Sequence, residues 1–166
     1  MDSLNNYVSH YREQLSKGHM QKAYKAIMTF MSSLGTYLGK KYPAYSVSAL
    51  YFGYMDMTYF AFTPPGLKSK KLKIAIVYLH QQGRFEAWLG AINRKVQAQY
   101  IELLSSKNTG KYKLSKVMPG VDSIIESILV GRPDFEKPEE LKIEIEKKTL
   151  EFTNDITSML DGLGTV

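Results

Sequence analysis

A cluster of polar and aromatic side chains in the middle of the chain is the best candidate for a binding site. Between residues 78 and 94 lie the only tryptophan, a tyrosine, a histidine and several charged or amide side chains. A tryptophan beside converging polar groups is typical of a small-ligand pocket. Two of these residues stand at the expected start of a helix, where free N–H groups attract anions. With two residues of the preceding strand region, the candidate ligand-binding set is Tyr54, Asp56, Tyr78, His80, Arg84, Glu86, Trp88, Asn93 and Arg94.

The same residues have a second, purely structural interpretation. Polar pairs across neighbouring strands are ordinary on a sheet that is wet on one face. Arg84, Glu86 and Tyr78 would then form a surface ladder, and Trp88 would fill the edge of the core. The sequence leaves both interpretations open.

Patterns that would indicate catalysis or metal binding are few. The chain has no cysteine, and its three histidines are too far apart to suggest a shared zinc ion. It has no phosphate-binding glycine loop and no GxSxG nucleophile turn. One enzymatic hypothesis is left, a hydrolase or transferase that uses Asp56, Glu86 and His80, and it requires these side chains to lie within reach of one another. We therefore expect no metal and no cofactor, and favour a non-catalytic protein.

Charge is unevenly distributed along the chain. Residues 1–120 carry 17 Lys and Arg against 5 Asp and Glu, a net charge of +12, while residues 121–166 carry 5 against 11, a net charge of −6. Such asymmetry raises the chance of binding nucleic acid or an acidic partner. In a single-stranded nucleic-acid complex, aromatic side chains would stack on bases. Phosphates would be contacted by Lys68, Lys70, Lys71, Lys73, Arg84, Arg94 and Lys95. The alternative is that the acidic segment lies against the basic one, within a chain or between two chains of a dimer.

Length and hydropathy predict the setting of the protein. A chain of 166 residues fits a single domain, 1–166. No apolar run is long enough to cross a membrane, and residues 1–15 lack the features of a secretory signal. Together with the missing cysteines, this favours the cytoplasm and predicts no membrane partner.

Two helices are expected before the candidate site. Apolar residues recur at helical spacing from Leu4 to Leu15, after a possible cap at Ser3. Gly18 is a natural left-handed stop, and a second helix should run from about residue 19 to residue 40. A tight glycine turn between the two predicts a helical hairpin.

The strands that would carry the site are expected between residues 46 and 91. Residues 46–63 are rich in aromatic and β-branched types, which predicts a long bent strand or a hairpin with a turn near Gly53–Asp56. The clearest hairpin joins residues 72–80 to residues 84–91 through a three-residue turn that ends at Gly83. If His80 faces Arg84, Tyr78 lies opposite Glu86, on the same graded face as Trp88, and the other face is wholly apolar.

Three helices are expected after the hairpin. They start at Asn93, at Asp122 and at Pro138. The predicted fold class is α+β, with an N-terminal helical hairpin, a central antiparallel β-meander of three or four strands, and three C-terminal helices. The helices should cover one face of the sheet and leave the other partly open.

Four segments carry a resemblance to known sequences: QLSKGHMQKAYKAIM, YFGYMDMTYFAFTP, LKIAIVYLHQQGRFEAWLGAINRKVQAQY, and GVDSIIESILV before PDF. Over nearly its full length the chain resembles an uncharacterised family of small bacterial proteins, a domain of unknown function. The resemblance implies a single-domain bacterial protein and transfers no activity, cofactor or catalytic residue.

The leading functional hypothesis is a non-catalytic cytoplasmic module that binds a small ligand or a protein partner on the open sheet face. Trp88 and Tyr78 would supply apolar contact, and Arg84, Arg94 and Asn93 would orient a polar or anionic group.

Overall fold

An antiparallel sheet forms the centre of the molecule, and its strands follow one another in space in the same order as in the chain. The structure is a computed structural model that describes residues 3–163. Its elements are α1 (Leu4–Ser16), α2 (His19–Lys41), β1 (Ser46–Val47), β2 (Met57–Thr63), α3 (Pro65–Lys68), β3 (Leu72–Leu79), β4 (Arg84–Ala91), α4 (Arg94–Ser105), β5 (Ser123–Val130) and α5 (Pro138–Asp161). The α+β class and the antiparallel meander are confirmed, with five strands where the sequence predicts three or four.

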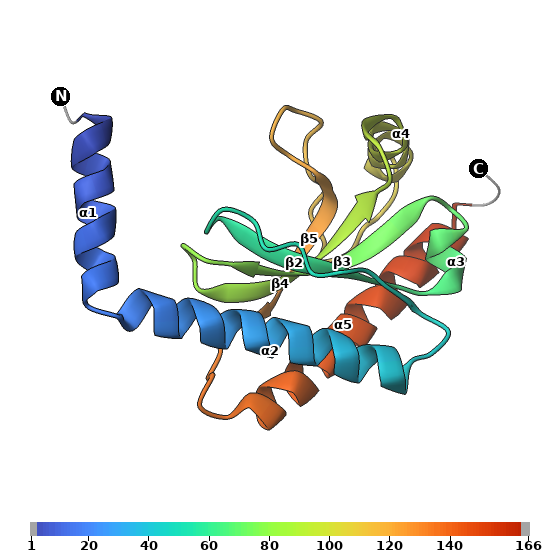
Figure 1. Cartoon of the computed structure of the whole chain (residues 1–166). Helices are drawn as coiled ribbons and strands as arrows, with labels where there is room; N and C mark the ends of the chain where they lie inside the picture. Colours follow the sequence, from blue (N-terminus) through green and yellow to red (C-terminus); the bar gives the residue numbers. More distant parts are fainter. Residues whose placement is uncertain (1–2, 164–166) are drawn as a thin grey trace.

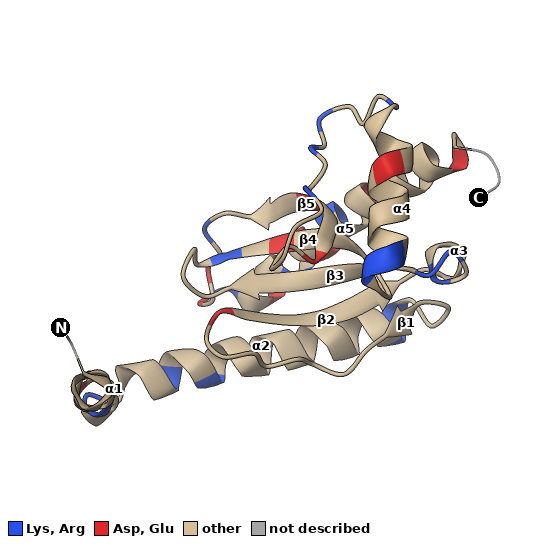
Figure 2. Ribbon diagram, turned by 90° about the horizontal axis from the view of Figure 1, so that it is seen from above, with Lys and Arg blue, Asp and Glu red and all other residues tan. Residues whose placement is uncertain are grey.

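Helices cover the two faces of the sheet unequally. Figure 1 shows α2 and α5 on one face, which we call the core face, and α4 over one end of the other, which we call the open face. On the core face, strand residues such as Ile76 and Phe85 join Leu34 of α2 and Phe152 of α5 in one buried apolar cluster. The expectation that one face is covered and the other partly open is therefore confirmed (Figures 1 and 2).

Local capping signals set the helix ends as the sequence predicts. The Ser3 side chain accepts a hydrogen bond from the backbone N–H of Asn6, and Asn93 accepts one from Val96. Gly18 separates α1 from α2 with a φ of +77°, in the left-handed region that favours glycine. No helix in the described range 3–163 is long and apolar enough to span a membrane.

The strand register between β3 and β4 differs from the predicted one by a residue. Leu79 pairs with Arg84, Tyr78 with Phe85, and Val77 with Glu86, so that the turn has four residues, 80–83. In this register the larger Ile74 and Ile76 enter the core with Phe85, while the smaller Ala75 and Val77 face the open side. Because a slip of one residue exchanges the two faces, Tyr78 lies on the core face, opposite to the face of Trp88 and Glu86.

Residues 123–130 form an edge strand, and the predicted helix that starts at Asp122 is wrong. The segment SIIESILV pairs with β4 from Ser123 to Val130. Its β-branched residues favour a strand, and eight residues is an ordinary strand length. Asp122 does not cap a helix but pairs with Arg94. The chain therefore has two long helices after the β3–β4 hairpin rather than three.

The first helix does not pack on the rest of the chain as the predicted helical hairpin would. Figures 1 and 2 show α1 turned away from α2 and set apart from the sheet. None of its residues, 4–16, is buried, and Leu4 is 75% exposed. The apolar stripe of α1 is thus uncovered in this chain.

A buried carboxylate links α2 to α5. Glu146 of α5 accepts hydrogen bonds from the hydroxyls of Tyr37 (2.5 Å) and Tyr42 (2.6 Å), and its other contact is Lys41 Nζ at 2.7 Å. Burial alone would raise the pKa of Glu146, but the hydrogen bonds from Lys41, Tyr37 and Tyr42 outweigh it and lower this pKa. Burial and the bond to Glu146 raise the pKa of Tyr42 to about 12. The carboxylate is therefore held in its charged form.

A tight turn before β2 confirms the predicted turn near Gly53–Asp56. Gly53 has a φ of +75°, and Asp56 Oδ1 accepts hydrogen bonds from the backbone N–H groups of Tyr54 (2.9 Å) and Met57 (2.7 Å). These backbone hydrogen bonds lower the pKa of Asp56. The turn fixes the point at which β2 begins.

Candidate functional site

A cavity of about 210 Å³ lies on the open face of the sheet beside Trp88. Its floor comes from β3 and β4, one wall from β2, and the opposite wall from the start of α4 and the start of β5. The residues that line it are Met57, Tyr59, Lys73, Ala75, Val77, Trp88, Gly90, Ala91, Ile92, Asn93, Arg94, Gln97, Asp122 and Ser123.

Small residues on β3 and β4 leave space for the cavity above the sheet. Ala75 lies opposite Trp88 across the β3–β4 ladder, and Gly90 lies opposite Lys73. A Cβ atom at Gly90 would stand 3.5 Å from Lys73 Cε, so the lysine stem lies directly against this glycine. The ammonium group extends toward the β2 wall, where Nζ lies 6.0 Å from the centre of the Tyr59 ring. This is within the range of a cation–π contact.

Lys73 carries a positive charge that no acidic side chain of residues 3–163 neutralises by direct contact. Asp122, the acid in the cavity wall, is instead paired with Arg94, whose Nη2 lies 2.9 Å from Asp122 Oδ1. The start of α4 adds a partial positive charge at the same wall, because backbone dipoles sum along a helix. The cavity therefore has an apolar floor, with the charge of Lys73 directed toward the β2 wall and the positive end of the α4 dipole at the opposite wall.

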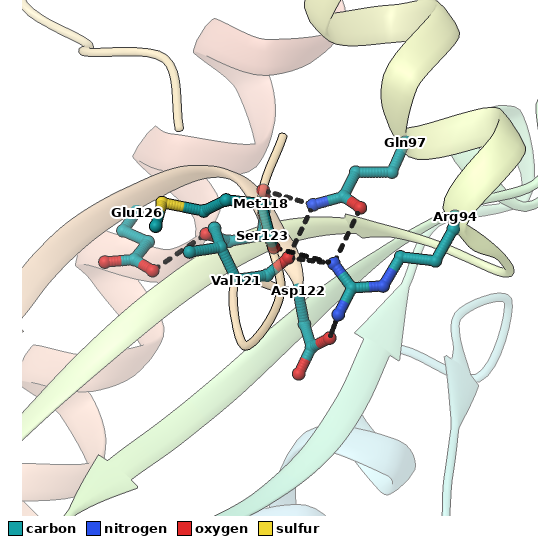
Figure 3. Close-up of polar contacts among 7 residues, drawn as sticks. All are labelled: Arg94, Gln97, Met118, Val121, Asp122, Ser123 and Glu126. Atoms are coloured by element: carbon teal, nitrogen blue, oxygen red, sulfur yellow. Dashed lines mark hydrogen bonds and ion pairs between the residues drawn. The ribbon is translucent and has the colours of Figure 1, made fainter. Parts of the chain in front are cut away.

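Arg94 and Gln97 hold the chain segment that leads into β5 (Figure 3). Arg94 donates to the carbonyl oxygens of Met118 and Val121, and also to the Gln97 side chain. The Gln97 amide donates to the carbonyl oxygens of Val121 (2.9 Å) and Ser123 (3.0 Å). These bonds occupy both side chains, so their first role is to build the cavity wall.

Replacing Arg94 by methionine should loosen this segment without unfolding the protein. Backbone-directed hydrogen bonds are worth about 0.5–1.5 kcal/mol each, and the half-exposed ion pair adds little. We expect amide hydrogen exchange across residues 107–122 to become about tenfold faster, which corresponds to ~1.4 kcal/mol of local stability. Exchange measured by mass spectrometry checks this. The matched control is Lys95→Met, at an exposed neighbouring position, and equal rates in the two variants would contradict the assignment.

Trp88 is held in place by a half-buried ion pair beside it, between Arg84 and Glu86. Its indole Nε1 donates to Glu86 Oε1 (2.9 Å), and Arg84 Nε donates to Glu86 Oε2 (2.6 Å). Glu86 is 3% exposed, and both of its carboxylate oxygens are used. Arg84 and Glu86 therefore orient the tryptophan and do not themselves line the cavity.

The structure brings only part of the sequence-predicted set together. Trp88, Asn93 and Arg94 line the cavity. Tyr78 is on the core face, in ring contact with Phe85. The two remaining candidates of the β2 region lie elsewhere, since Asp56 closes the turn before β2 and Tyr54 is 89% exposed.

His80 also lies away from the cavity. Its ring stacks on Tyr24 of α2, and its Nε2 lies 2.8 Å from Thr58 Oγ1, a residue buried on the core face. Burial lowers the pKa of His80. Glu86 is on the opposite face of the sheet, so the reach that the hydrolase or transferase hypothesis requires among Asp56, Glu86 and His80 is not met.

The cations of the nucleic-acid hypothesis are likewise divided. Arg84 is paired with Glu86, and Arg94 is paired with Asp122. Lys73 lies in the cavity.

No group of three metal-ligating side chains occurs in the described part of the chain.

Five polar or aromatic residues of the cavity are missing from the predicted ligand-binding set, namely Tyr59, Lys73, Gln97, Asp122 and Ser123. Lys73 and Tyr59 were within reach of sequence reasoning. Alternation places residues 73, 75 and 77 on one face, and the correct pairings of Ala75 with Trp88 and of Val77 with Tyr59 add both aromatic residues to that face. The positions of Gln97 and Ser123 in the cavity depend on the pairing of β5 with the sheet, which no local sequence pattern predicts.

Comparison with known proteins identifies a family to which the chain is similar. The sequence model of a domain of unknown function matches residues 4–160. No curated protein and no solved structure is significantly similar to the chain.

Proposed function

The chain belongs to the family DUF7000, a domain of unknown function, and from this premise we propose that it binds a small planar anion, of the aromatic carboxylate class, in the cavity beside Trp88. The observation that carries the proposal is the pairing of an apolar, aromatic-walled floor with Lys73, a cation without an acidic partner among the described residues. The non-catalytic role, the absence of a cofactor and the cytoplasmic setting stay predictions from the sequence.

The size of the cavity limits the ligand to about one ring. Pockets for drug-sized ligands occupy roughly 300–1,000 Å³. The cavity here measures about 210 Å³. Two aromatic side chains line it, Trp88 on β4 and Tyr59 on β2, and they favour contact with a flat apolar ligand.

The charges of the cavity select an anion. Lys73 offers an ammonium group, and the first turn of α4 offers the positive end of the helix dipole. Arg94 and Asp122 cancel each other at the same wall. A neutral or cationic analogue of the same shape would leave the ammonium group of Lys73 without a partner. The affinity for the carboxylate is therefore expected to exceed the affinity for the corresponding amide.

The single tryptophan makes binding directly measurable. Because Trp88 is the only tryptophan in the chain, its fluorescence reports on the lining of the cavity. Benzoate and larger single-ring carboxylates are the probes, with benzamide and benzylamine as neutral and cationic controls of similar shape. We expect a saturable change with the carboxylates and a weaker or absent one with the controls. Equal responses to benzoate and benzamide would contradict the proposal.

Replacing Lys73 by methionine should weaken binding of the carboxylate about tenfold, because it removes the ammonium group and keeps most of the apolar stem; a factor of ten corresponds to ~1.4 kcal/mol. The fluorescence titration with the best carboxylate measures this. Lys70→Met is the matched control, since Lys70 stands near in the chain and does not line the cavity. Equal losses in the two variants would show a general charge effect and not a site.

A further inference from the structure

An apolar surface outside the cavity is concentrated at one end of the molecule. It consists of the stripe on α1 and the segment before β2, and we call it the end patch. Its residues are Leu4, Tyr7, Val8, Tyr11, Tyr51, Phe52, Tyr54 and Met55, with exposed fractions between 45% and 89%. More than half of the large hydrophobic side chains that are exposed in the described chain belong to it.

Both halves of the end patch lie at the same end. α1 continues from the N-terminal end of α2, where Tyr24 stacks on His80 of the β3–β4 turn. The backbone N–H of His80 donates to the carbonyl of Asp56, which places the turn before β2 there as well. Figures 1 and 2 agree, since both show α1 beyond this end of the sheet.

The α1 half of the end patch lacks a partner in its own chain. α1 has 13 residues, and none of residues 4–16 is buried. Isolated helices shorter than about 12–15 residues are marginal in water, and most helical stability in proteins comes from packing an apolar face. Leu4, Tyr7, Val8 and Tyr11 follow the spacing of one such face.

We infer that the end patch joins two copies of this chain into a symmetric dimer, in which α1 of each copy packs on the segment 51–55 of the other. The exposed area of the end patch is large enough for such a dimer interface. Eight side chains, five of them aromatic, expose on the order of 900 Å² per copy, and a standard interface buries ~800 Å² per partner. Tyrosine and phenylalanine are enriched in the cores of such interfaces.

Charge also favours a second copy over other occupants. The chain carries a net charge of +6, so two copies associate best through a surface that is itself uncharged. Arg12 and Glu13 cancel on α1, and residues 48–55 hold no charged side chain. A helix that binds membranes would instead carry many Lys and Arg on its polar face, and residues 4–16 contain Arg12 alone.

Sedimentation velocity of the full chain over a concentration series tests the inference. We expect a species of twice the 18.9 kDa chain mass, and an association that is unchanged or strengthened by salt. The double variant Tyr7→Ser/Tyr11→Ser and, separately, Tyr54→Ser should each raise the dimer dissociation constant at least tenfold. Ile143→Ser, at an exposed apolar site on α5, is the control and should leave it unchanged.

A cross-link identifies the contact itself. Because the chain has no cysteine, each introduced thiol reports only on its own neighbourhood. A mixture of Tyr11→Cys and Tyr54→Cys chains should form a covalent heterodimer with a short bis-maleimide, whereas a mixture of Tyr11→Cys and Ile143→Cys chains should not. A monomer at every concentration would overturn the inference. So would a dimer that dissociates in high salt or that keeps its affinity in both tyrosine variants.

Discussion

Replacing Glu146 by alanine is expected to lower the free energy of unfolding by about 3 kcal/mol. The change leaves the hydroxyls of Tyr37 and Tyr42 without their acceptor, and hydrogen bonds to a charged group are worth ~1.5–3 kcal/mol each. The bond from Lys41 adds less, because that side chain is half exposed and exposed ion pairs contribute little. Chemical denaturation at pH 7 measures the difference.

The same helix supplies the control for Glu146. Glu144 pairs with Lys148 on the exposed side of α5, and Glu144→Ala should cost no more than ~0.5 kcal/mol. The effect of Glu146 should also depend on pH. Since the pKa of Glu146 is lowered from its ordinary value of 4.5, its stabilisation is complete above pH 4.5 and is lost as the pH falls through the folded-state pKa. A difference between wild type and Glu146→Ala that persists unchanged at pH 3 would contradict the role of the charged form.

Replacing Gly53 by alanine is expected to cost roughly 3 kcal/mol, because two penalties combine. The left-handed φ of +75° costs an alanine ~1–2 kcal/mol. In addition, the new Cβ would stand 2.0 Å from the carbonyl oxygen of Met57, and relieving such overpacking costs ~1–3 kcal/mol. The turn that starts β2 must therefore shift, and with it Met57 in the cavity wall.

Gly110→Ala separates the two penalties for Gly53. Gly110 has a similar φ of +61°, but nothing lies within 4 Å of the Cβ position. It should show the backbone cost alone, about half of the effect at Gly53. Chemical denaturation measures the loss of unfolding free energy in each variant. Equal losses would mean that the Met57 carbonyl moves aside without an energetic penalty.

The sequence predicts well those features that depend on a few adjacent residues. Ser3, Gly18, Asn93 and the turn at Gly53–Asp56 all lie where local capping and turn chemistry place them. These signals depend on backbone groups within about four residues, which a single sequence contains in full.

Features set by distant partners could not be predicted in the same way. The apolar residues of 123–130 suit a helix or a strand, and the free edge of β4 decides between them. The β3–β4 register depends on whether Ile76 or Val77 meets the helices, which requires knowing where α2 and α5 lie. The candidate site depends on both the β5 pairing and the β3–β4 register. Trp88 could therefore be identified from the sequence, whereas Gln97 could not.

The position of α5 at the end of the fold has a consequence for how the protein is made. The five strands pair in chain order, so each hairpin can close as soon as its residues leave the ribosome. α5 supplies Ile145, Phe152 and Ile156 to the core face, and it follows all five strands in the chain. At ~5–20 residues per second, a sheet without this cover persists for roughly 1–5 s on the nascent chain. During that interval α2 is the long helix available to cover the core face, and the core is complete only once α5 packs beside it.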